Sequence, residues 1–442
     1  MAETSFMFPR GFLWGTATAS HQVEGNNKNN NWWAWEQEPG RIAGGGKSGL
    51  ACDWWGGRWR EDFDRAAQSG QNAHRLSVEW SRVQPSPDRW DEDALDHYRE
   101  MVRGLVERDL TPLVTLHHFT EPVWFSEKGG WEAEDAPALF AAYVEKVVEA
   151  LKEYASLWCT INEPNVLAAE AYFLGLWPPG KRDFRAMQRV MLALGMAHGA
   201  AWEVIRERQP VSRIGMAVQY RGFQPARSWN PLDRMVAAGY GRIFNSFYPR
   251  LLTEGVAPLP AGRRRIQKLA GTHDYLGLNY YTTDNVSFNL RHYREAFTRR
   301  YYPEGASLSP SGFIANRPEG LQQAVRWGRQ FGRPMIITEN GVEDAQDRLR
   351  PRYLVEHVHQ IWRAVNQNVP VKGYFHWTLT DNFEWERGWE QRFGLWELDP
   401  ESQARRKRAS ADLYAEICKA NAIPSDVVER YAPDVHREIF PV

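Results

Sequence analysis

Two glutamates end short apolar runs, at places where a carboxylate could act on a substrate. Glu339 closes a β-branched run, and the pair Asn340-Gly341 that follows it is a strong turn signal. Glu163 closes a second run, and Pro164 ends that strand because proline cannot donate to a strand ladder. We therefore expect both carboxylates at the carboxyl ends of buried strands.

A pair of carboxyl groups in one pocket suits acid and nucleophile chemistry. A solvated carboxylate is the plain alternative for either glutamate alone, but each has an asparagine beside it and a sharp stop. Hydrolysis of a glycosidic bond needs one carboxyl group to protonate the leaving oxygen and a second to meet the oxocarbenium-like centre. Arg75 could supply the cation that keeps Glu339 ionised, and that negative charge would raise the pKa of Glu163. The alternative for Arg75 is a structural ion pair.

Eight strand-like runs alternate with eight amphipathic helical patterns along the chain. The strands are expected at residues 12–19, 73–79, 113–119, 157–162, 213–219, 275–281, 335–338 and 373–378. The helices are expected at residues 59–69, 93–108, 136–154, 184–208, 232–252, 319–331, 352–366 and 409–420. Strict alternation implies right-handed crossovers and parallel strands, and eight repeats close into a barrel rather than an open sheet. The predicted fold class is α/β, a single (β/α)8 TIM barrel.

No Gly/Ser-rich linker or shift in composition divides the chain, so residues 1–442 are expected to form one catalytic barrel domain. Extended βα loops are expected around residues 25–58, 120–133, 165–182, 283–317 and 380–406. Such loops decorate the face of a barrel where active sites are found. Both strand-end glutamates are expected on that face.

Composition and charge narrow the class of protein. The 442 residues are 43% hydrophobic and 25% charged, which is typical of a globular chain with a large core. The net charge of −1 leaves no basic surplus for nucleic-acid phosphates, and the mixed charges do not suit a membrane surface. Three scattered cysteines argue against a disulfide framework or a metal cluster. Residues 1–10 lack a leader pattern, and we expect a cytoplasmic protein.

Tryptophan is unusually frequent, with 21 residues, and much of it lies in expected loops. The clusters are Trp32, Trp33 and Trp35, then Trp54, Trp55 and Trp59, and finally Trp385, Trp389 and Trp396. Packing of long loops onto the barrel is the ordinary explanation for any one of them. Flat apolar faces also suit sugar rings, whose hydroxyl groups bind a few fixed polar groups.

Four motifs, in order along the chain, resemble those of glycoside hydrolase family 1, the β-glucosidase family. They are residues 8–25 (FPRGFLWGTATASHQVEG), 160–164 (TINEP), 337–341 (ITENG), and 381–385 (DNFEW) followed by 392–395 (RFGL). The resemblance implies that Glu163 is the general acid/base and Glu339 the nucleophile, in a reaction that retains the β configuration through a glycosyl-enzyme. A retaining mechanism places the two carboxyl groups about 5–5.5 Å apart.

The same resemblance assigns the sugar-binding positions. They are Gln22, His118, Asn162, Tyr281, Trp377, Glu384 and Trp385, with Trp377 as the stacking floor. It also implies that Tyr281 holds the nucleophile and that Asn279 belongs to the same polar network. From the residues alone, Gln22 follows the first strand and His118 ends the third, so both face the active end. Each could equally be a packed polar residue.

The chain departs from the family pattern at two positions. Phe119 stands where many relatives have tryptophan, so an indole N–H donor to the sugar is absent. Asn165 replaces a frequent aromatic residue, and Trp177 is a candidate substitute for that platform on the leaving-group side. Glu384 argues against phosphorylated substrates, because the family's 6-phospho-glycosidases commonly carry a smaller neutral residue there. Glu163 argues against a myrosinase, which would have glutamine.

Three other patterns carry less weight. Residues 44–48 (GGGKS) lack the first glycine of a phosphate loop, since Arg41 stands there. His117 and His118 are adjacent and so point to opposite sides of a strand, which does not suit a metal site. Cys159 lies inside a strand and suits core packing better than nucleophilic attack.

The sequence thus predicts a retaining exo-β-glycosidase that needs no cofactor and no metal. Its substrate would be a terminal β-glucosyl residue, with galactosyl and fucosyl also plausible, in β-linked glucosides or oligosaccharides such as cellobiose. One alternative is a non-catalytic sugar-binding barrel of the same fold, which the presence of both carboxylates disfavours. The other is a metal-dependent barrel hydrolase, whose turnover would stop after exhaustive chelation.

Overall fold

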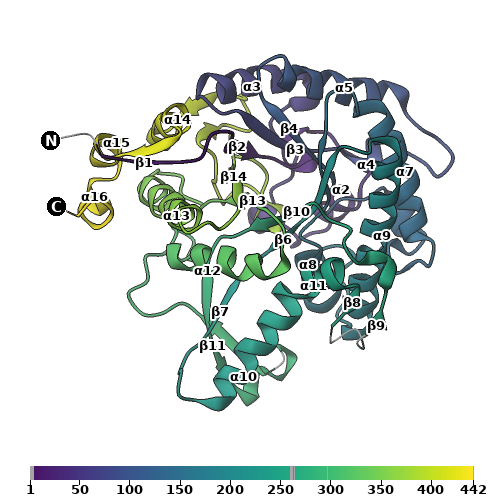
Figure 1. The fold of residues 1–442 in the computed structure, drawn as a ribbon. Helices are drawn as coiled ribbons and strands as arrows, with labels where there is room; N and C mark the ends of the chain where they lie inside the picture. The colour runs from purple at the N-terminus through teal and green to yellow at the C-terminus, as the bar shows by residue number, and fades with distance from the viewer. Residues whose placement is uncertain (1–3, 259–261, 263, 296, 442) are drawn as a thin grey trace.

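Eight parallel strands close into a barrel at the centre of the molecule (Figure 1). The computed structural model describes residues 4–258, 262, 264–295 and 297–441. The barrel strands are β2 (Leu13–Ala17), β3 (Ala73–Ser77), β4 (Thr111–His117), β5 (Leu157–Asn162), β6 (Arg213–Gln219), β10 (Tyr275–Asn279), β13 (Met335–Asn340) and β14 (Val371–Trp377). They meet in the order β10-β13-β14-β2-β3-β4-β5-β6. The predicted TIM barrel is confirmed.

The strands are almost wholly buried, because side chains fill the barrel on one face and helices cover the other. The covering helices are α3 (Trp59–Gln68), α5 (Glu92–Val106), α7 (Ala136–Leu151), α9 (Phe184–Arg208), α11 (Phe247–Glu254), α12 (Pro318–Gly328), α13 (Arg350–Val365) and α14 (Ala409–Ala420). Aspartates cap two of them. Asp91 accepts a hydrogen bond from Ala94 N at 3.0 Å before α5, and Asp183 accepts one from Arg185 N at 2.7 Å before α9.

The single helix expected at residues 232–252 is wrong. The chain forms α10 (Pro231–Tyr240), a wider helical turn at Gly241–Asn245, and then α11. Pro249 explains the break, because its ring would clash with the carbonyl four residues earlier and it has no N–H to donate. Asn245 fixes the junction, since its side chain accepts from Arg221 N and donates to Arg221 O.

Strand ends differ from the expected ones by a few residues. The run expected at 113–119 ends at His117, because Phe119 takes a left-handed conformation with φ of 69°. The strand expected at 335–338 runs on to Asn340, so Glu339 lies within the last residues of β13 rather than just after it. These shifts leave every barrel strand in its predicted place.

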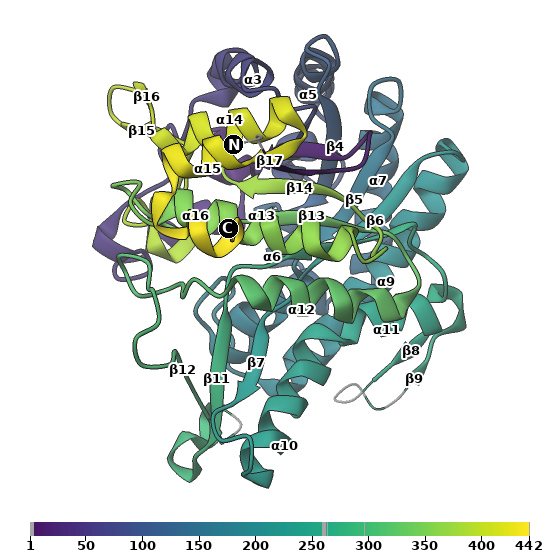
Figure 2. The same cartoon turned by 60° about the vertical axis from the view of Figure 1, so that its left-hand side comes forward.

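The stretch expected as a loop at 283–317 contains two strands outside the barrel. Strands β7 (Gly222–Pro225), β11 (Thr283–Phe288) and β12 (Thr298–Tyr301) form a separate three-stranded sheet. Figure 1 and Figure 2 show this sheet and α10 extending away from one side of the barrel. Its strands come after β6 and β10, so the sheet stands at the end of the barrel where those strands finish.

Short elements complete the chain. The βα loops hold α1 (Ser20–Val23), α2 (Asn31–Glu36), α4 (Trp80–Val83), α6 (Val123–Glu127) and α8 (Pro164–Leu167), which continues into a wider-turned helix at Ala168–Leu174. Two-stranded sheets pair β1 (Ser5–Met7) with β17 (Ala422–Pro424), β8 (Val256–Ala257) with β9 (Arg264–Arg265), and β15 (Trp396–Leu398) with β16 (Arg405–Lys407). Helices α15 (Ser425–Tyr431) and α16 (Pro433–Ile439) follow.

Tryptophans contribute heavily to the core. Fully buried indoles include Trp14, Trp32, Trp54, Trp80, Trp131 and Trp158. Most also donate a hydrogen bond, as Trp54 Nε1 does to Asp62 at 2.8 Å. The three cysteines are buried with free thiols. Among the described helices, none has the length and apolar character needed to cross a membrane.

Gly341, directly after β13, has no room for a side chain, because an added Cβ would lie 2.0 Å from the carbonyl oxygen of Trp377. Overpacking of this kind costs about 1–3 kcal/mol. We expect Gly341→Ala to lower the unfolding temperature measured by circular dichroism. Gly239→Ala in α10 is the control, since nothing lies within 4 Å of its added Cβ and alanine favours helix. An unchanged unfolding temperature for Gly341→Ala would contradict the prediction.

Candidate active site

Glu163 and Glu339 line one cavity of about 270 Å³, formed by residues at and beyond the carboxyl ends of the barrel strands. Glu163 directly follows β5, and Glu339 is the last residue but one of β13. Their exposed fractions are only 5% and 3%. The structure therefore brings together the two acids that the sequence singled out. Their separation of about 5–5.5 Å stays a prediction.

The carboxylate of Glu339 is held by two donors. Arg75 Nη1 lies 2.5 Å from its Oε1, and the hydroxyl of Tyr281 donates to its Oε2 at 2.6 Å. Arg75 is fully buried in β3, and it also donates to Thr115 Oγ1 at 3.0 Å and to the carbonyl of Thr338 at 3.2 Å. The guanidinium is thus fixed in place and supplies the cation expected beside Glu339.

Glu163 stands on a sharp backbone turn. Its φ of 41° and ψ of 54° are left-handed, and Pro164 opens α8 directly behind it. A left-handed conformation costs a residue other than glycine about 1–3 kcal/mol, and such strain gathers at functional sites. The only hydrogen bond that its carboxyl group makes in the described part of the chain comes from Asn279 Nδ2, at 2.8 Å. Glu163 therefore lacks the cationic partner that Glu339 has.

Asn162 links these groups and fixes the orientation of His118. Its Oδ1 accepts from Arg75 Nη2 at 2.7 Å and from Asn279 Nδ2 at 3.1 Å, so its Nδ2 must face the other way. That Nδ2 lies 3.1 Å from His118 Nε2, which must then be the acceptor. The proton of the imidazole is consequently on Nδ1, which has no partner among the described residues. Burial lowers the pKa of His118 well below its usual value, so the ring is neutral.

The two carboxyl groups have unequal surroundings. Burial raises the pKa of Glu163 well above its ordinary value, and the charge of Glu339 raises it further. Burial also raises the pKa of Glu339, but Arg75 and the hydroxyl of Tyr281 work against that rise. The first proton therefore belongs on Glu163, and the negative charge on Glu339.

Glu384 and the residues around it form another polar wall of the cavity. Gln22 Nε2 donates to Glu384 Oε2 at 3.1 Å and to the carbonyl of Phe383 at 2.7 Å, which leaves Gln22 Oε1 without a partner in the described chain. Burial and the neighbouring charge of Glu386 raise the pKa of Glu384 to about 8. Gln22, Asn162, Arg75 and Asn279 stand behind residues that line the cavity rather than lining it themselves.

Aromatic rings close the cavity. Trp377 and Trp385 both line it, and the His118 ring lies roughly parallel to each at 6.0 Å. Phe119 packs against Trp177 at 4.7 Å and Trp385 at 5.2 Å. The rings that line the cavity are thus themselves held by ring contacts.

Asn165 and its candidate substitute Trp177 differ in where their side chains point. Asn165 turns into the protein, where its Nδ2 donates to the carbonyls of Gln219 at 2.8 Å and Phe244 at 3.1 Å. Trp177 is 7% exposed, packs on Trp32 and Phe119, and donates its indole N–H to Glu386 Oε2 at 2.6 Å. Trp177 does line the cavity, so its role as a substitute platform stays a prediction.

Sequence reasoning missed the charged residues that line the outer part of the cavity. They are Glu170, Arg221, Arg300, Glu386 and Arg387. Glu386 and Arg387 directly follow the DNFEW motif, so their position could have pointed to them. Arg221 and Arg300 gave no signal, because only the fold brings the extra sheet beside the barrel.

A model of glycosyl hydrolase family 1 matches residues 4–423. The chain belongs to glycosyl hydrolase family 1. The beta-glucosidase A of Thermotoga maritima is 32% identical over 447 residues, which cover 94% of this chain and 98% of the relative. A beta-galactosidase of Saccharolobus solfataricus is 29% identical, and the match covers 96% of this chain and 97% of that relative.

Solved structures agree with this family. A beta-glycosidase from Pyrococcus horikoshii has a TM-score of 0.90 and 34% identity, and the match covers 97% of this chain and 98% of that one. The beta-glucosidase from Thermotoga maritima in complex with glucoimidazole has a TM-score of 0.89 and 30% identity. That match covers 94% of this chain and 99% of the other. The protein is a glycoside hydrolase, and as a member of family 1 it retains the configuration of the sugar.

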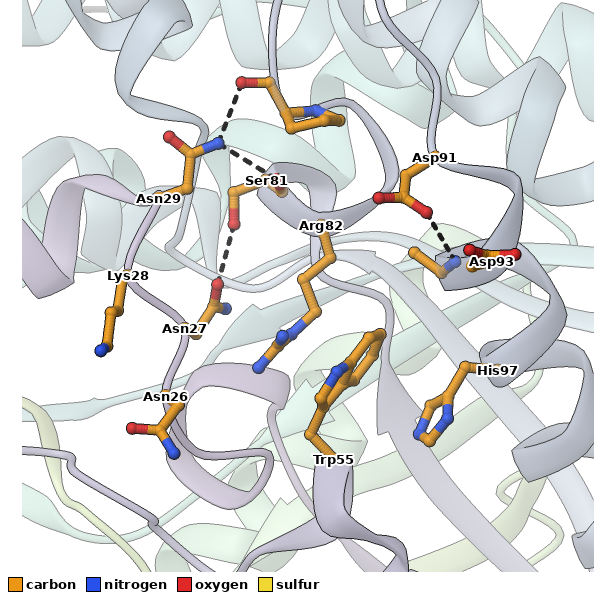
Figure 3. A pocket seen from close by; sticks show the side chains of 12 residues that line it. Asn26, Asn27, Lys28, Asn29, Trp55, Ser81, Arg82, Asp91, Asp93 and His97 are labelled. Atoms are coloured by element: carbon orange, nitrogen blue, oxygen red, sulfur yellow. Dashed lines mark hydrogen bonds between the residues drawn. The ribbon is translucent and has the colours of Figure 1, made fainter.

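A larger depression of about 600 Å³ shares no lining residue with the family 1 cavity. Figure 3 shows it between Asn26–Asn29 and the start of α5, with Trp55 between Arg82 and His97. Arg82 is satisfied by Glu24 at 2.7 Å, and Asn29 donates to the carbonyl of Pro85 at 2.9 Å. The depression has no pair of strand-end carboxylates.

The remaining sequence patterns have structural roles in this family 1 barrel. Ser48, in the glycine-rich stretch, donates from its N and Oγ to the carboxylate of Glu36, at 2.9 and 3.0 Å. His117 packs against Trp131, on the other side from His118. Cys159 is buried in β5. Among the described residues, no group of three or more His, Cys, Asp or Glu side chains could hold a metal ion.

Removing the buried cation should leave Glu339 as an unpaired buried charge. We expect Arg75→Met to lower the free energy of unfolding by roughly 3–5 kcal/mol near neutral pH. Without Arg75, the pKa of Glu339 in the folded protein rises further above its unfolded value. The folded state then binds a proton more readily, so the deficit should shrink as the pH falls. Chemical denaturation of the variant and the wild type, from neutral pH to acidic pH, measures the difference in their free energies of unfolding.

The double variant Arg75→Met/Glu339→Gln is the control for that experiment. It removes the cation and the carboxylate together, so it should lose less stability than Arg75→Met alone and show no recovery at low pH. An equal loss in both variants, at every pH, would show that the ion pair is not what Arg75 provides.

Proposed function

We propose that the protein is an exo-acting β-glycosidase that removes terminal non-reducing β-D-glucosyl residues, with Glu339 as nucleophile and Glu163 as general acid/base. The observation that carries the proposal is the unequal setting of two carboxyl groups in one cavity. Glu339 is paired with Arg75 and Tyr281, whereas Glu163 has a single neutral donor. An ionised carboxylate and a protonated carboxyl group are the two partners that glycoside hydrolysis needs.

In the first step, a carboxylate oxygen of Glu339 forms a bond to the anomeric carbon. The bond from that carbon to the leaving oxygen breaks, and the proton of Glu163 passes to the leaving oxygen. The product of this step is a glycosyl ester of Glu339 and a free alcohol. The ester carries no charge, so the main neighbouring cause of the high pKa of Glu163 disappears.

In the second step, Glu163 acts as a base. It takes a proton from water while the water oxygen attacks the anomeric carbon and the ester bond breaks. Glu339 regains its negative charge beside Arg75, and Glu163 is protonated again. Two inversions at the same carbon give overall retention.

An unsatisfied polar atom supports recognition of sugar hydroxyl groups. His118 lines the cavity, and its Nδ1–H is a donor without a partner among the described residues. The carboxyl group of Glu384 lines the same cavity. Buried polar atoms normally have partners, so this gap indicates a polyhydroxylated ligand between polar walls and the faces of Trp377 and Trp385. The relatives named beta-glucosidase and beta-galactosidase support glucose, with galactose and fucose as further substrates.

Hydrolysis of 4-nitrophenyl β-glucoside tests the proposal directly. We expect the purified protein to release 4-nitrophenol and to give β-glucose as the first product, detected by NMR before mutarotation. A non-catalytic sugar-binding barrel would release no dye while still being stabilised by glucose. A first product of the α configuration would contradict the retaining mechanism.

Glu339→Gly should lose activity because no carboxylate remains to attack the anomeric carbon. Azide can enter the vacated space and attack from the same side, so added azide should restore turnover of an activated aryl β-glucoside. The expected product is the α-glucosyl azide, identified by NMR. Formation of the β-azide would reverse the roles of the two glutamates.

Glu163→Ala removes the proton donor but leaves the nucleophile. Substrates with poor leaving groups should slow by about 10²–10⁴-fold, whereas glycosylation by 4-nitrophenyl or 2,4-dinitrophenyl glucosides should change far less. Pre-steady-state measurement of dye release separates this step from hydrolysis of the ester. Equal losses for good and poor leaving groups would argue against the acid role.

A further inference from the structure

We propose that the outer end of the three-stranded sheet of β7, β11 and β12 binds the surface of a bilayer that contains anionic lipids. This end, named the tip, consists of residues 226–235, 289–292 and 297–299. Figure 1 and Figure 2 show it at the bottom of the molecule, extending away from the barrel. Binding there would fix where the enzyme acts and would leave its chemistry unchanged.

Strand register places both segments of the tip at the same end of the sheet. Strands β7 and β11 run parallel, with Pro225 opposite Val286, so the chain leaves both strands in the same direction. Strand β12 returns antiparallel to β11, with Thr298 opposite Phe288. The segment after β7 and the connection from β11 to β12 therefore lie beyond the same end of the sheet.

The tip concentrates exposed apolar side chains. Fourteen large hydrophobic residues are exposed in the described chain, and five of them belong to the tip. They are Trp229, Leu232, Met235, Leu290 and Phe297. Trp229 is 76% exposed and Leu290 is 71% exposed. Exposed apolar residues are normally scattered singly over a surface, so their concentration at one end indicates a binding surface.

Helix α10 turns a polar residue inward and apolar residues outward. The carboxylate of Asp233 is buried and accepts a hydrogen bond from the sheet, at Phe288 N. Met235 follows Asp233 by two residues, which is about 200° of rotation in a helix, so it projects to the opposite side. Leu232 lies beside Met235, three residues before it. Packing within the chain therefore does not explain this exposed apolar stripe.

Hydrogen bonds hold the tip in this arrangement. Asp233 Oδ1 accepts from Phe288 N at 2.9 Å, and the two carboxylate oxygens accept from Arg227 at 2.8 and 3.0 Å. At the other end of α10, the hydroxyl group of Tyr240 donates to the carbonyl of Glu295 at 2.8 Å. The exposed side chains therefore extend from a backbone that is fixed to the sheet.

The charge of the tip region is positive. The sequence places five arginines and two acidic residues in the stretches 226–235 and 289–299. One of these acids, Asp233, is buried in its ion pair with Arg227. The net charge of −1 for the whole chain conceals this local excess, because acidic residues elsewhere cancel it. A membrane surface is therefore a partner that the charge of the whole chain could not indicate.

Three arginines of the tip are available to a partner. Arg234, Arg291 and Arg299 are exposed, and none of them forms an ion pair with another described residue. An anionic bilayer matches both kinds of exposed side chain. The apolar side chains can enter the interfacial layer, and the guanidinium groups can contact lipid phosphates.

Other partners fit the tip less well. Two tips brought together would oppose their arginines, and a standard protein interface uses roughly 20–30 residues from each partner. The tip extends away from the rest of the molecule, so few further residues could join such a contact (Figure 2). A purely acidic protein surface would satisfy the arginines but would leave Trp229 and Leu290 without an apolar environment.

Sedimentation with lipid vesicles tests the proposal. At low ionic strength, we expect the wild type to sediment with vesicles of phosphatidylcholine and phosphatidylglycerol. It should stay in solution with vesicles of phosphatidylcholine alone. Added salt should release part of the bound protein, because salt screens the attraction between the arginines and the lipid phosphates.

Two double variants separate the apolar contribution from the charged one. Trp229→Ser/Leu290→Ser removes apolar area, and Arg234→Glu/Arg291→Glu reverses two charges. Each should lower the partition coefficient for the anionic vesicles by about tenfold or more. Circular dichroism should give the unfolding temperature of the wild type for both variants, since all four residues are exposed. The two variants change different residues, so either one tests the proposal if the other fails to fold.

Matched controls make the same changes near the amino ends of barrel strands. Val106→Ser/Val211→Ser replaces two exposed apolar residues, of which Val211 is 89% exposed. Arg10→Glu/Arg329→Glu reverses two exposed charges before β2 and β13. Both controls should bind the anionic vesicles as the wild type does.

Three results would overturn the proposal. The first is a wild type that does not sediment with anionic vesicles, or whose sedimentation neither tip variant reduces. The second is a dimer, detected by light scattering, that Trp229→Ser/Leu290→Ser disrupts, which would assign the tip to a second copy of the chain. The third is retention on immobilised poly-glutamate without binding to vesicles, which would assign the tip to an acidic protein.

Discussion

A buried ion pair between Arg75 and Glu339 organises the centre of the molecule. A guanidinium without exposed surface must satisfy its donors inside the protein, and Arg75 does so on β4, β5 and β13 from its own place in β3. Closing the barrel is what brings these strands within reach of one side chain. Closure of the barrel and formation of the ion pair therefore depend on each other. Either Arg75 or Glu339 without its partner would be a costly buried charge.

The same ion pair explains how two glutamates in one cavity can differ in protonation. Both glutamates are deeply buried, and burial alone would favour a proton on each. Arg75 and Tyr281 offset that cost for one of them, and its charge then increases the cost for the other. Asn279 donates to Glu163 and Asn162 without adding charge, so it holds the carboxyl group of Glu163 in place.

Much of this arrangement could be predicted from the sequence. The strands are short apolar runs that end at turn residues. Glu163 and Glu339 each lie where such a run ends. The helix at 232–252 was expected as one piece because its apolar pattern continues through Pro249, although that proline was itself a local signal of a break. In the extra sheet, β7 pairs with β11 across more than fifty residues of chain, as Gly222 does with Thr283, so no local signal joins them. Strands β11 and β12 pair locally, as Phe288 does with Thr298, and that pair was missed within the stretch expected as a loop.

The parts of the site that belong to local sequence motifs could be predicted, and the parts that the fold brings together could not. Motif residues on the barrel strands lie where they were expected, around one cavity. Asn165 was recognised as unusual, but its turn toward Gln219 and Phe244 could be found only in three dimensions. The outer charges depend on the same kind of information, because Glu170 and Arg300 come from different parts of the chain.

The two parts of the cavity are therefore built by different parts of the chain. Barrel strands carry Arg75 and Glu339, and Glu163 directly follows one of them. The sheet of β7, β11 and β12 carries Arg300 and Asp284, and it is attached outside the barrel. Insertions or replacements within that attachment would change the outer lining of the cavity without touching Arg75, Glu163 or Glu339. We therefore expect such enzymes to diversify by changes in the separate sheet of β7, β11 and β12, while the barrel strands stay the same.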